Sequence, residues 1–161
     1  MAVDAELFRA ALGRLATGIT VLTARDRAGR GAGRAHGMTA SAVTSLSLEP
    51  PMVLVCVGHE ASLHDTLVAA EVFGVNVLAA HQRDIAERFA LRGRQAWENE
   101  TPASPAGLPL VADALVHLDC RRAAVYPGGD HSIVTGVVEW ARARDGAPLC
   151  YFRSAYTELA G

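Results

Sequence analysis

Short runs of β-branched and apolar residues, separated by turn-forming residues, constrain the fold of this chain more than any other feature of its sequence. Runs of this composition favour strands. The runs that we predict to be strands are Ile19 to Ala24, Met52 to Val57, Phe73 to Leu78, Ala114 to Tyr126 and His131 to Ala143, with a short sixth at Leu149 to Phe152. The chain is therefore expected to be mainly β.

Two segments in the first half of the chain have the spacing of amphipathic helices. The first begins at Asp4, a residue type that caps helices, and runs to Gly18, a residue type that stops them. The second covers residues 62–71, where Ser62 and Asp65 form a capping-box pattern. Both are predicted to be amphipathic helices.

A third helix is predicted at residues 81–90, with Ile85 and Phe89 on one face. The predicted helices do not fall regularly between strands, which disfavours a doubly wound parallel sheet. A mostly antiparallel sheet that closes into a small barrel, with helices at its periphery, fits the pattern better. Residues 92–109 are polar, contain three prolines and are predicted to be a long loop.

The composition limits the classes of partner. Among 161 residues, 15 Lys and Arg against 17 Asp and Glu leave a formal net charge of −2, so no nucleic-acid partner is indicated. The longest apolar run, Met52 to Val57, is far shorter than the roughly 20 residues that cross a membrane as a helix, and no signal-peptide pattern is present. We expect one domain over residues 1–161, cytoplasmic and without a membrane partner.

The cysteines and histidines indicate neither disulfides nor a metal. Cys56, Cys120 and Cys150 are an odd number at wide spacing in apolar surroundings, which is typical of reduced, buried thiols. His59 and His64 would lie about 140° apart around a helix, so they are not expected to converge on an ion.

Two motifs that suggest other enzyme classes are set aside. The glycine-rich stretch from Gly29 to Gly37 contains a G-x-G core, but no helix is expected after it to hold a pyrophosphate, so a flexible basic hairpin loop is predicted. Asp130, His131 and Ser132 have the residue types of a hydrolase triad. Successive strand residues point to opposite faces, however, so these three cannot form one together.

A dense group of hydroxyl side chains precedes the strand at Met52. It has two interpretations that composition does not separate. One is an edge strand with a polar turn. The other is a neutral site that holds a phosphate or the carbonyl edge of a heterocycle through hydroxyls and backbone N–H groups. The hydroxyl residues are Thr39, Ser41, Thr44, Ser45 and Ser47.

Five segments, which together cover nearly the whole chain, carry a specific combination of motifs. They are FRAALGRLATGITVLTA, HGMTASAVTSLSLEPPMVLVCV, SLHDTLVAAEVFGVNVLA, GGDHSIVTGVVE and PLCYFRSAYTEL. In this order, and at roughly this spacing, they resemble the short flavin reductases that serve two-component flavin-dependent monooxygenases. The combination of M-T-A-S, S-L-S-L-E-P-P, F-G-V-N-V-L and G-D-H is specific, and the chain is identified as a member of that family.

The resemblance implies a homodimeric, FMN-binding split β-barrel with FMN or FAD in a groove and NADH or NADPH as reductant. The residues matching flavin-binding positions are Met38, Thr39, Ala40, Ser41, Thr44, Ser45, Val57, Ser62 and Phe89, the last bordering the flavin ring. Those matching nicotinamide-binding positions are His131, Arg153 and Tyr156. Glu60 departs from the family pattern, because a carboxylate close to the expected phosphate would repel it.

The strand that begins at His131 opens in an unusual way, with Gly128, Gly129 and Asp130 before it. Two residues without side chains let the chain turn sharply and let a flat cofactor approach closely. Asp130 can turn its carboxylate onto nearby backbone N–H groups and so fix the entry to the strand. His131 is then expected to face the groove, where an imidazole can donate to a carboxamide. A structural histidine at a tight turn is the alternative.

The function that the resemblance implies is an NAD(P)H:flavin oxidoreductase, which supplies diffusible reduced flavin to a partner monooxygenase. Hydride transfer between cofactors needs little acid or base help, so no catalytic residue is assigned, and backbone N–H groups of Thr39 to Ser41 are expected to stabilise charge on the reduced ring. The alternative is a split-barrel flavoprotein that holds its flavin permanently as a carrier, sensor or structural cofactor. The choices between FMN and FAD, and between NADH and NADPH, stay open.

Overall fold

The computed structural model describes residues 3–26, 33–92, 95–97 and 102–159. The helices are α1 (Ala5–Leu12), α2 (His64–Ala69) and α3 (Arg83–Ala90). The strands are β1 (Thr17–Gly18), β2 (Thr20–Arg25), β3 (Ala35–Ala40), β4 (Val43–Leu48), β5 (Pro51–Gly58), β6 (Val72–Val77), β7 (Gln95–Ala96), β8 (Val116–Gly128), β9 (His131–Ala143), β10 (Cys150–Phe152) and β11 (Ala155–Thr157).

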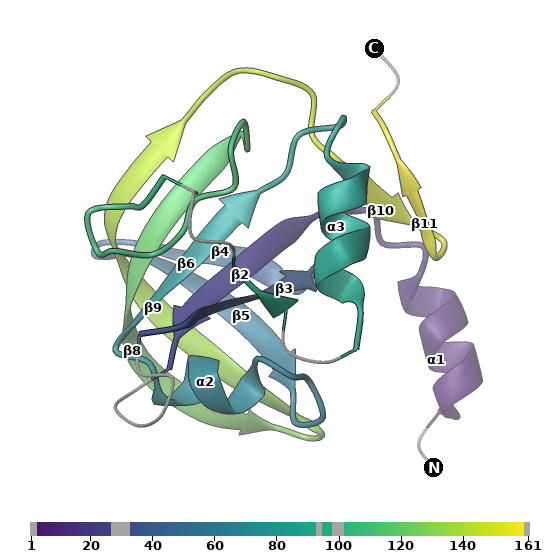
Figure 1. Ribbon diagram of the computed structural model, residues 1–161. Helices are drawn as coiled ribbons and strands as arrows, with labels where there is room; N and C mark the ends of the chain where they lie inside the picture. Colours follow the sequence, from purple (N-terminus) through teal and green to yellow (C-terminus); the bar gives the residue numbers. More distant parts are fainter. Residues whose placement is uncertain (1–2, 27–32, 93–94, 98–101, 160–161) are drawn as a thin grey trace.

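Eight of these strands form one curved sheet, in the order β4-β5-β9-β8-β6-β2-β3-β7, and β1, β10 and β11 form a small second sheet. Every pair of neighbouring strands is antiparallel. The large sheet wraps around a central core, α2 lies at one end of it, and α3 lies beside β3 and the small sheet (Figure 1). The expectation of a mainly β, antiparallel barrel with peripheral helices is confirmed.

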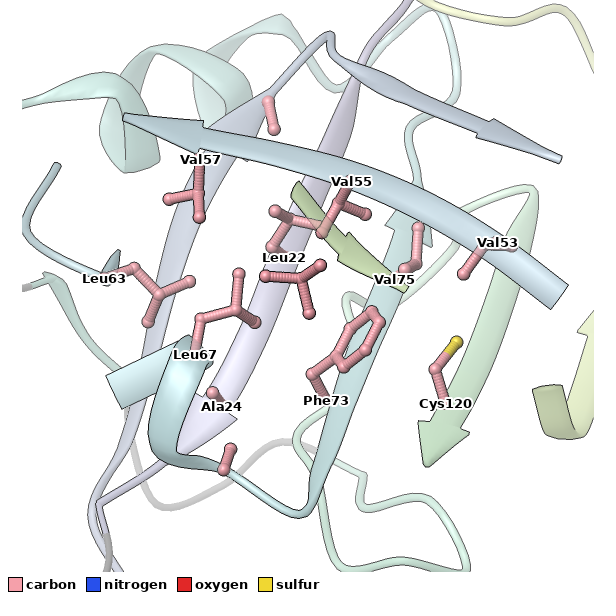
Figure 2. Close-up of a cluster of buried hydrophobic side chains, with 13 residues drawn as sticks. Leu22, Ala24, Val53, Val55, Val57, Leu63, Leu67, Phe73, Val75 and Cys120 are labelled. Atoms are coloured by element: carbon pink, nitrogen blue, oxygen red, sulfur yellow. The ribbon is translucent and has the colours of Figure 1, made fainter. Parts of the chain in front are cut away.

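The core follows from the alternation of apolar side chains along the strands. Residues of β2, β5, β6 and β8 meet inside the sheet, and Leu63 and Leu67 enter from the α2 segment (Figure 2). Phe73 of β6 lies at the centre and has no exposed surface. A second cluster forms where Ala86 and Phe89 of α3 pack against the outer side of the sheet. Both sequence-predicted helices of the middle of the chain therefore pack as amphipathic helices do.

Two helix ends differ from the prediction. Asp4 caps α1 as expected, because its Oδ1 accepts a hydrogen bond from the Leu7 N–H at 2.8 Å. The helix ends at Gly13, however, because Thr17 and Gly18 pair with β10 as a strand. The capping box at α2 is wrong: α2 begins after Leu63, and no side chain caps it.

The segments expected to be loops contain more pairing than predicted. Within residues 92–109, β7 pairs with the start of β3, and Ala103 forms a bridge with Pro109. In the glycine-rich stretch from Gly29 to Gly37, the flanking β2 and β3 pair as an antiparallel hairpin, but residues 27–32 lie outside the described residues, so its loop is not tested.

The three cysteines are free thiols. Cys120 and Cys150 are buried as predicted, whereas Cys56 is only half-buried because it alternates outward on β5. Burial raises the pKa of the Cys120 thiol to about 12, and the neighbouring Asp119 carboxylate adds to this rise. Within the described residues, no helix has the length and apolar character that crossing a membrane requires.

Candidate functional site: a groove between β3, α3 and the turn before α2

A groove of about 580 Å³ opens between three elements that are distant in the sequence. A volume of this size is typical of pockets for small molecules and cofactors. β3 supplies one wall, the turn between β5 and α2 supplies the second, and the end of α3 with the residues after it supplies the third. The lining residues are Met38, Thr39, Glu60, Ala61, Ser62, Phe89, Ala90, Leu91 and Arg92.

The β3 wall is joined to α3 by a hydrogen bond. The Thr39 hydroxyl donates to the carbonyl oxygen of Ala86 at 2.7 Å, so this predicted flavin residue also fixes the helix against the strand. β3 pairs with β7 only at His36 and Gly37. Among the described strands, none pairs with β3 on that side beyond Gly37, so the backbone groups that point to this edge of β3 are open beside the groove. Such groups are strong hydrogen-bonding partners for a ligand.

An aromatic stack supports the α3 wall. The rings of Phe89 and Trp97 are stacked, with centroids 4.7 Å apart, and the Arg88 guanidinium lies 5.2 Å from the Phe89 centroid. This packing needs a glycine at position 37, because an added Cβ would lie 2.6 Å from Phe89. Trp97 was not selected from the sequence. Its stacking partner, Phe89, is eight residues earlier in another element, so no local signal marks it.

The turn before α2 is held by the tip of the β8–β9 hairpin. The His59 N–H donates to the Asp130 carbonyl oxygen at 2.9 Å, and Gly58 pairs with His131. The His131 ring lies beside Gly58: a Cβ added there would be 3.5 Å from His131 Nε2, an ordinary van der Waals distance. The opening of this strand with glycines, Asp130 and His131 therefore places the imidazole next to the turn that lines the groove.

Asp130 selects the tautomer of the His131 ring. His131 Nδ1 lies 2.6 Å from Asp130 Oδ1, and this hydrogen bond is the main cause that lowers the pKa of the Asp130 carboxyl. An ionised carboxylate only accepts, so Nδ1 carries the hydrogen. In a neutral ring, His131 Nε2 is then an acceptor, and not the donor to a carboxamide that we predicted.

A second histidine connects α2 to β9. His64 Nε2 lies 2.9 Å from the Ser132 hydroxyl, and His64 Nδ1 lies 2.9 Å from Asp65 Oδ1. The His59 and His64 rings also touch edge to face, with centroids 5.1 Å apart. They meet because His59 lies in the turn before α2, so the helical spacing between residues 59 and 64 does not apply to this pair. Across the described residues, no group of three His, Cys, Asp or Glu is arranged to hold a metal.

Four of the predicted flavin residues, Met38, Thr39, Ser62 and Phe89, come together in the groove. The side chains of Ala40 and Val57 belong to the buried core, and neither residue lines the groove. Ser41, Thr44 and Ser45 are exposed on β4 and the turn before it, and they do not line this groove. β4 is an edge strand of the large sheet, which agrees with the first interpretation of the hydroxyl-rich segment. The roles of all these residues stay predictions.

Arg153 and Tyr156, the two predicted nicotinamide residues of the C-terminal segment, are distant from His131 in the sequence and contact other elements than His131 does. Arg153 is at the turn between β10 and β11, where its φ is 50° and its N–H donates to Gly13 at the end of α1. The Tyr156 ring packs edge to face on Tyr151 and under the Arg83 guanidinium, 5.6 Å from it, and burial raises the pKa of its hydroxyl. Tyr156 thus contacts α3, whose far end borders the groove.

Arg92 lines the groove but was not selected from the sequence. It follows α3 by two residues, in the segment predicted to be a polar loop, where one arginine among several carries no distinguishing signal. Only the fold shows that this arginine and Glu60 face the same space.

An antiparallel barrel with a groove of this kind defines a class of ligand-binding β protein, and comparison with known proteins gives its family. The sequence model of the protein family described as "flavin reductase like domain" matches residues 12–160 of this chain. The reductase component of 4-hydroxyphenylacetate 3-monooxygenase from Thermus thermophilus is 41% identical over 155 residues, which cover 96% of this chain and 96% of that protein. An FMN reductase (NADH), SmoA, from Agrobacterium fabrum is 38% identical and is covered to 83%, with 92% of this chain.

Among solved structures, the NADH:FAD oxidoreductase SgcE6 of Streptomyces globisporus, in complex with NAD and FAD fragments, superposes with a TM-score of 0.87 at 33% identity, covering 99% of this chain and 97% of that one. The chain belongs to the flavin reductase like family. The predictions of this family, of its split-barrel fold and of a flavin reductase that uses a nicotinamide cofactor are confirmed by these relatives.

Proposed function

We propose that this chain acts as a single flavin reductase domain, which reduces FMN or FAD with NADH in the groove between β3, α3 and the turn before α2. The observation that carries the proposal is the meeting of Met38, Thr39, Ser62 and Phe89 around one groove in a chain of this family. The groove has an apolar part, formed by Met38 and Phe89, and a polar part, formed by the turn before α2. This division suits a flavin, which has a flat ring and a polar side chain.

The residues around the groove then contact different parts of the two cofactors. Bound flavin accepts the hydride, and the protein orients the two partners. Met38 and Phe89 hold the ring by apolar contact, and Thr39 fixes the position of α3. Backbone groups on the open edge of β3 are positioned to bond the carbonyl edge of the ring. His131 lies beyond the turn, where its Nε2 can accept a hydrogen bond from the nicotinamide carboxamide.

We propose further that the protein is a homodimer. Helix α1 buries none of its residues, and Leu7 and Phe8 are each 58% exposed. An isolated helix of this length is not stable by itself, so its apolar face needs a partner. Leu91, on the rim of the groove, is also 62% exposed. A second copy that covers α1 supplies this burial, and one that reaches Leu91 would also close the groove.

We propose that reduced flavin leaves by diffusion to a separate monooxygenase, as several relatives are named reductase components of such enzymes. The groove is open, and its charged lining residues, Glu60 and Arg92, are of opposite sign, so no net charge attracts a phosphorylated flavin and affinity should be modest. A cytoplasmic location stays a prediction.

The test follows the absorbance of NADH with and without added FMN or FAD. Loss of NADH that depends on flavin is the expected result, and no loss with either flavin would contradict the proposed function. A second experiment places enzyme, NADH and flavin on one side of a small-molecule membrane without oxygen, with an oxidant on the other side. Reduction across the membrane is expected. Flavin that instead co-purifies in stoichiometric amount and reduces nothing across it indicates a permanently bound flavin.

A further inference from the structure

Two unpaired, opposite charges line the same groove. Glu60 comes from the turn before α2, and Arg92 comes from the segment after α3. Within the part of the chain that the structure describes, neither side chain has an ion pair or a side-chain hydrogen bond. An ionisable side chain beside a binding groove that is not used to hold the fold is available to act on a ligand.

The shape of a flavin decides which part of it meets these charges. Its ring is apolar and flat, so it belongs against Met38 and Phe89, and its 5′ side chain then extends toward the turn and the rim of the groove. Riboflavin carries no charge in that side chain. FMN carries a phosphomonoester with about two negative charges at neutral to alkaline pH, and FAD carries two singly charged phosphates.

We propose that Glu60 and Arg92 balance each other at the mouth of the groove, so that its affinity for a flavin depends little on the 5′-phosphate. Arg92 then attracts the phosphate of a bound flavin, and Glu60 opposes it. This inference rests on the proposed function. Two residues thus set how strongly the groove responds to the phosphate. Arg92 was not predicted from the sequence, and Glu60 departs from the family pattern.

The experiment measures dissociation constants for riboflavin, FMN and FAD from quenching of flavin fluorescence, at low salt and without NADH. For the unmodified protein, the three constants should agree within about threefold. Glu60→Gln should tighten FMN relative to riboflavin by about fivefold, and Arg92→Gln should weaken it by about the same factor, the size expected for one charge acting near a protein surface. The double variant should return to a ratio near that of the unmodified protein, and high salt should shrink both single shifts.

Matched controls separate this local effect from a change in net charge. Asp145→Asn and Arg142→Gln remove the same charges from exposed residues that do not line the groove, and they should leave the ratio of the FMN and riboflavin constants unchanged. Glu60→Lys, which reverses the charge, should tighten FMN beyond Glu60→Gln.

Three results would overturn the proposal: a ratio between FMN and riboflavin above about tenfold in the unmodified protein, equal shifts for riboflavin and FMN in the variants, or single variants that move FMN in the same direction. In all three, the flavins still bind, so the proposed function stands. If none of the three flavins is quenched, the proposed function fails, and the charge proposal fails with it.

Discussion

His131 shows how a single residue acquires its role from its neighbours. Its Nδ1 is engaged by Asp130, and its ring lies beside Gly58, where the turn that borders the groove begins. The ring is half-exposed, so a ligand can reach Nε2. A neutral imidazole held in this way offers one acceptor in a defined direction.

We predict that His131→Ala raises the KM for NADH about tenfold, because one hydrogen bond worth about 1.4 kcal/mol is lost, while the dissociation constant for flavin changes little. Initial rates at varied NADH and varied flavin separate the two effects. Asp130→Asn is the companion variant: it keeps the imidazole but weakens the bond that orients it, so its KM should lie between those of the unmodified protein and His131→Ala. A collapse of flavin affinity with an unchanged KM for NADH would show that the ring belongs to the flavin side.

At the scale of elements, the turn before α2 is the wall of the groove that depends most on distant contacts. The β8–β9 hairpin holds one end of this turn through His59, and His64 holds the other end through Ser132. Ser132 is buried, so its hydroxyl depends on His64 for a partner. The short helix α2 has no side-chain cap of its own, and packing of Leu63 and Leu67 in the core supplies the rest of its stability.

We predict that His64→Ala lowers the free energy of unfolding by about 1–3 kcal/mol, because it leaves the buried Ser132 hydroxyl unpaired. Urea unfolding of His64→Ala, Ser132→Ala and the double variant gives the coupling energy, which should be favourable and at least about 0.5 kcal/mol. His64→Ala should also raise the KM for flavin with little change in kcat, and His64→Gln, whose amide can still reach Ser132, should restore part of both. Additive single effects would mean that the two side chains do not stabilise the turn together.

At the scale of the whole molecule, α1 is the helix whose apolar residues find no packing partner within a single described chain. It extends from the barrel beside β10 and β11 (Figure 1), and none of its residues is buried. Arg153 and Gly13 connect its end to the small sheet through one backbone hydrogen bond. An amphipathic helix in this position is expected to pack against a second copy of the chain.

We predict that Leu7→Glu combined with Phe8→Glu converts the dimer to a monomer, because charges replace the apolar face of α1. Light scattering at increasing protein concentration measures the change. Leu48→Glu is the comparison variant, because Leu48 is 88% exposed on the edge strand β4 and lies on a different element. If Leu48→Glu separates the subunits and the α1 variant does not, the interface lies on β4. A monomer in the unmodified protein would contradict the homodimer.

Much of the fold was predictable from local pattern. The bounds of β9, the positions of β2, β5, β6 and β8, and the existence of all three helices follow from periodicity, which depends only on neighbours in the sequence. The errors fell where tertiary pairing overrides a local signal. The helix stop moved to Gly13 because Thr17 pairs with β10, and part of the polar loop became β7 because β3 offered it an edge.

The candidate site divides in the same way. The motifs around Met38 and Phe89 could be recognised from the sequence, since each is a short contiguous stretch. Three other features could not be recognised: the positions of Trp97 and Arg92, and the contact of His64 with Ser132. Each involves residues that are distant in the sequence and that only the folded barrel brings together. The sequence by itself determined the antiparallel β class and the family, through periodicity and motifs. Only the tertiary structure decided which side chains share the groove, because a groove is formed by the closure of distant strands and helices on one another.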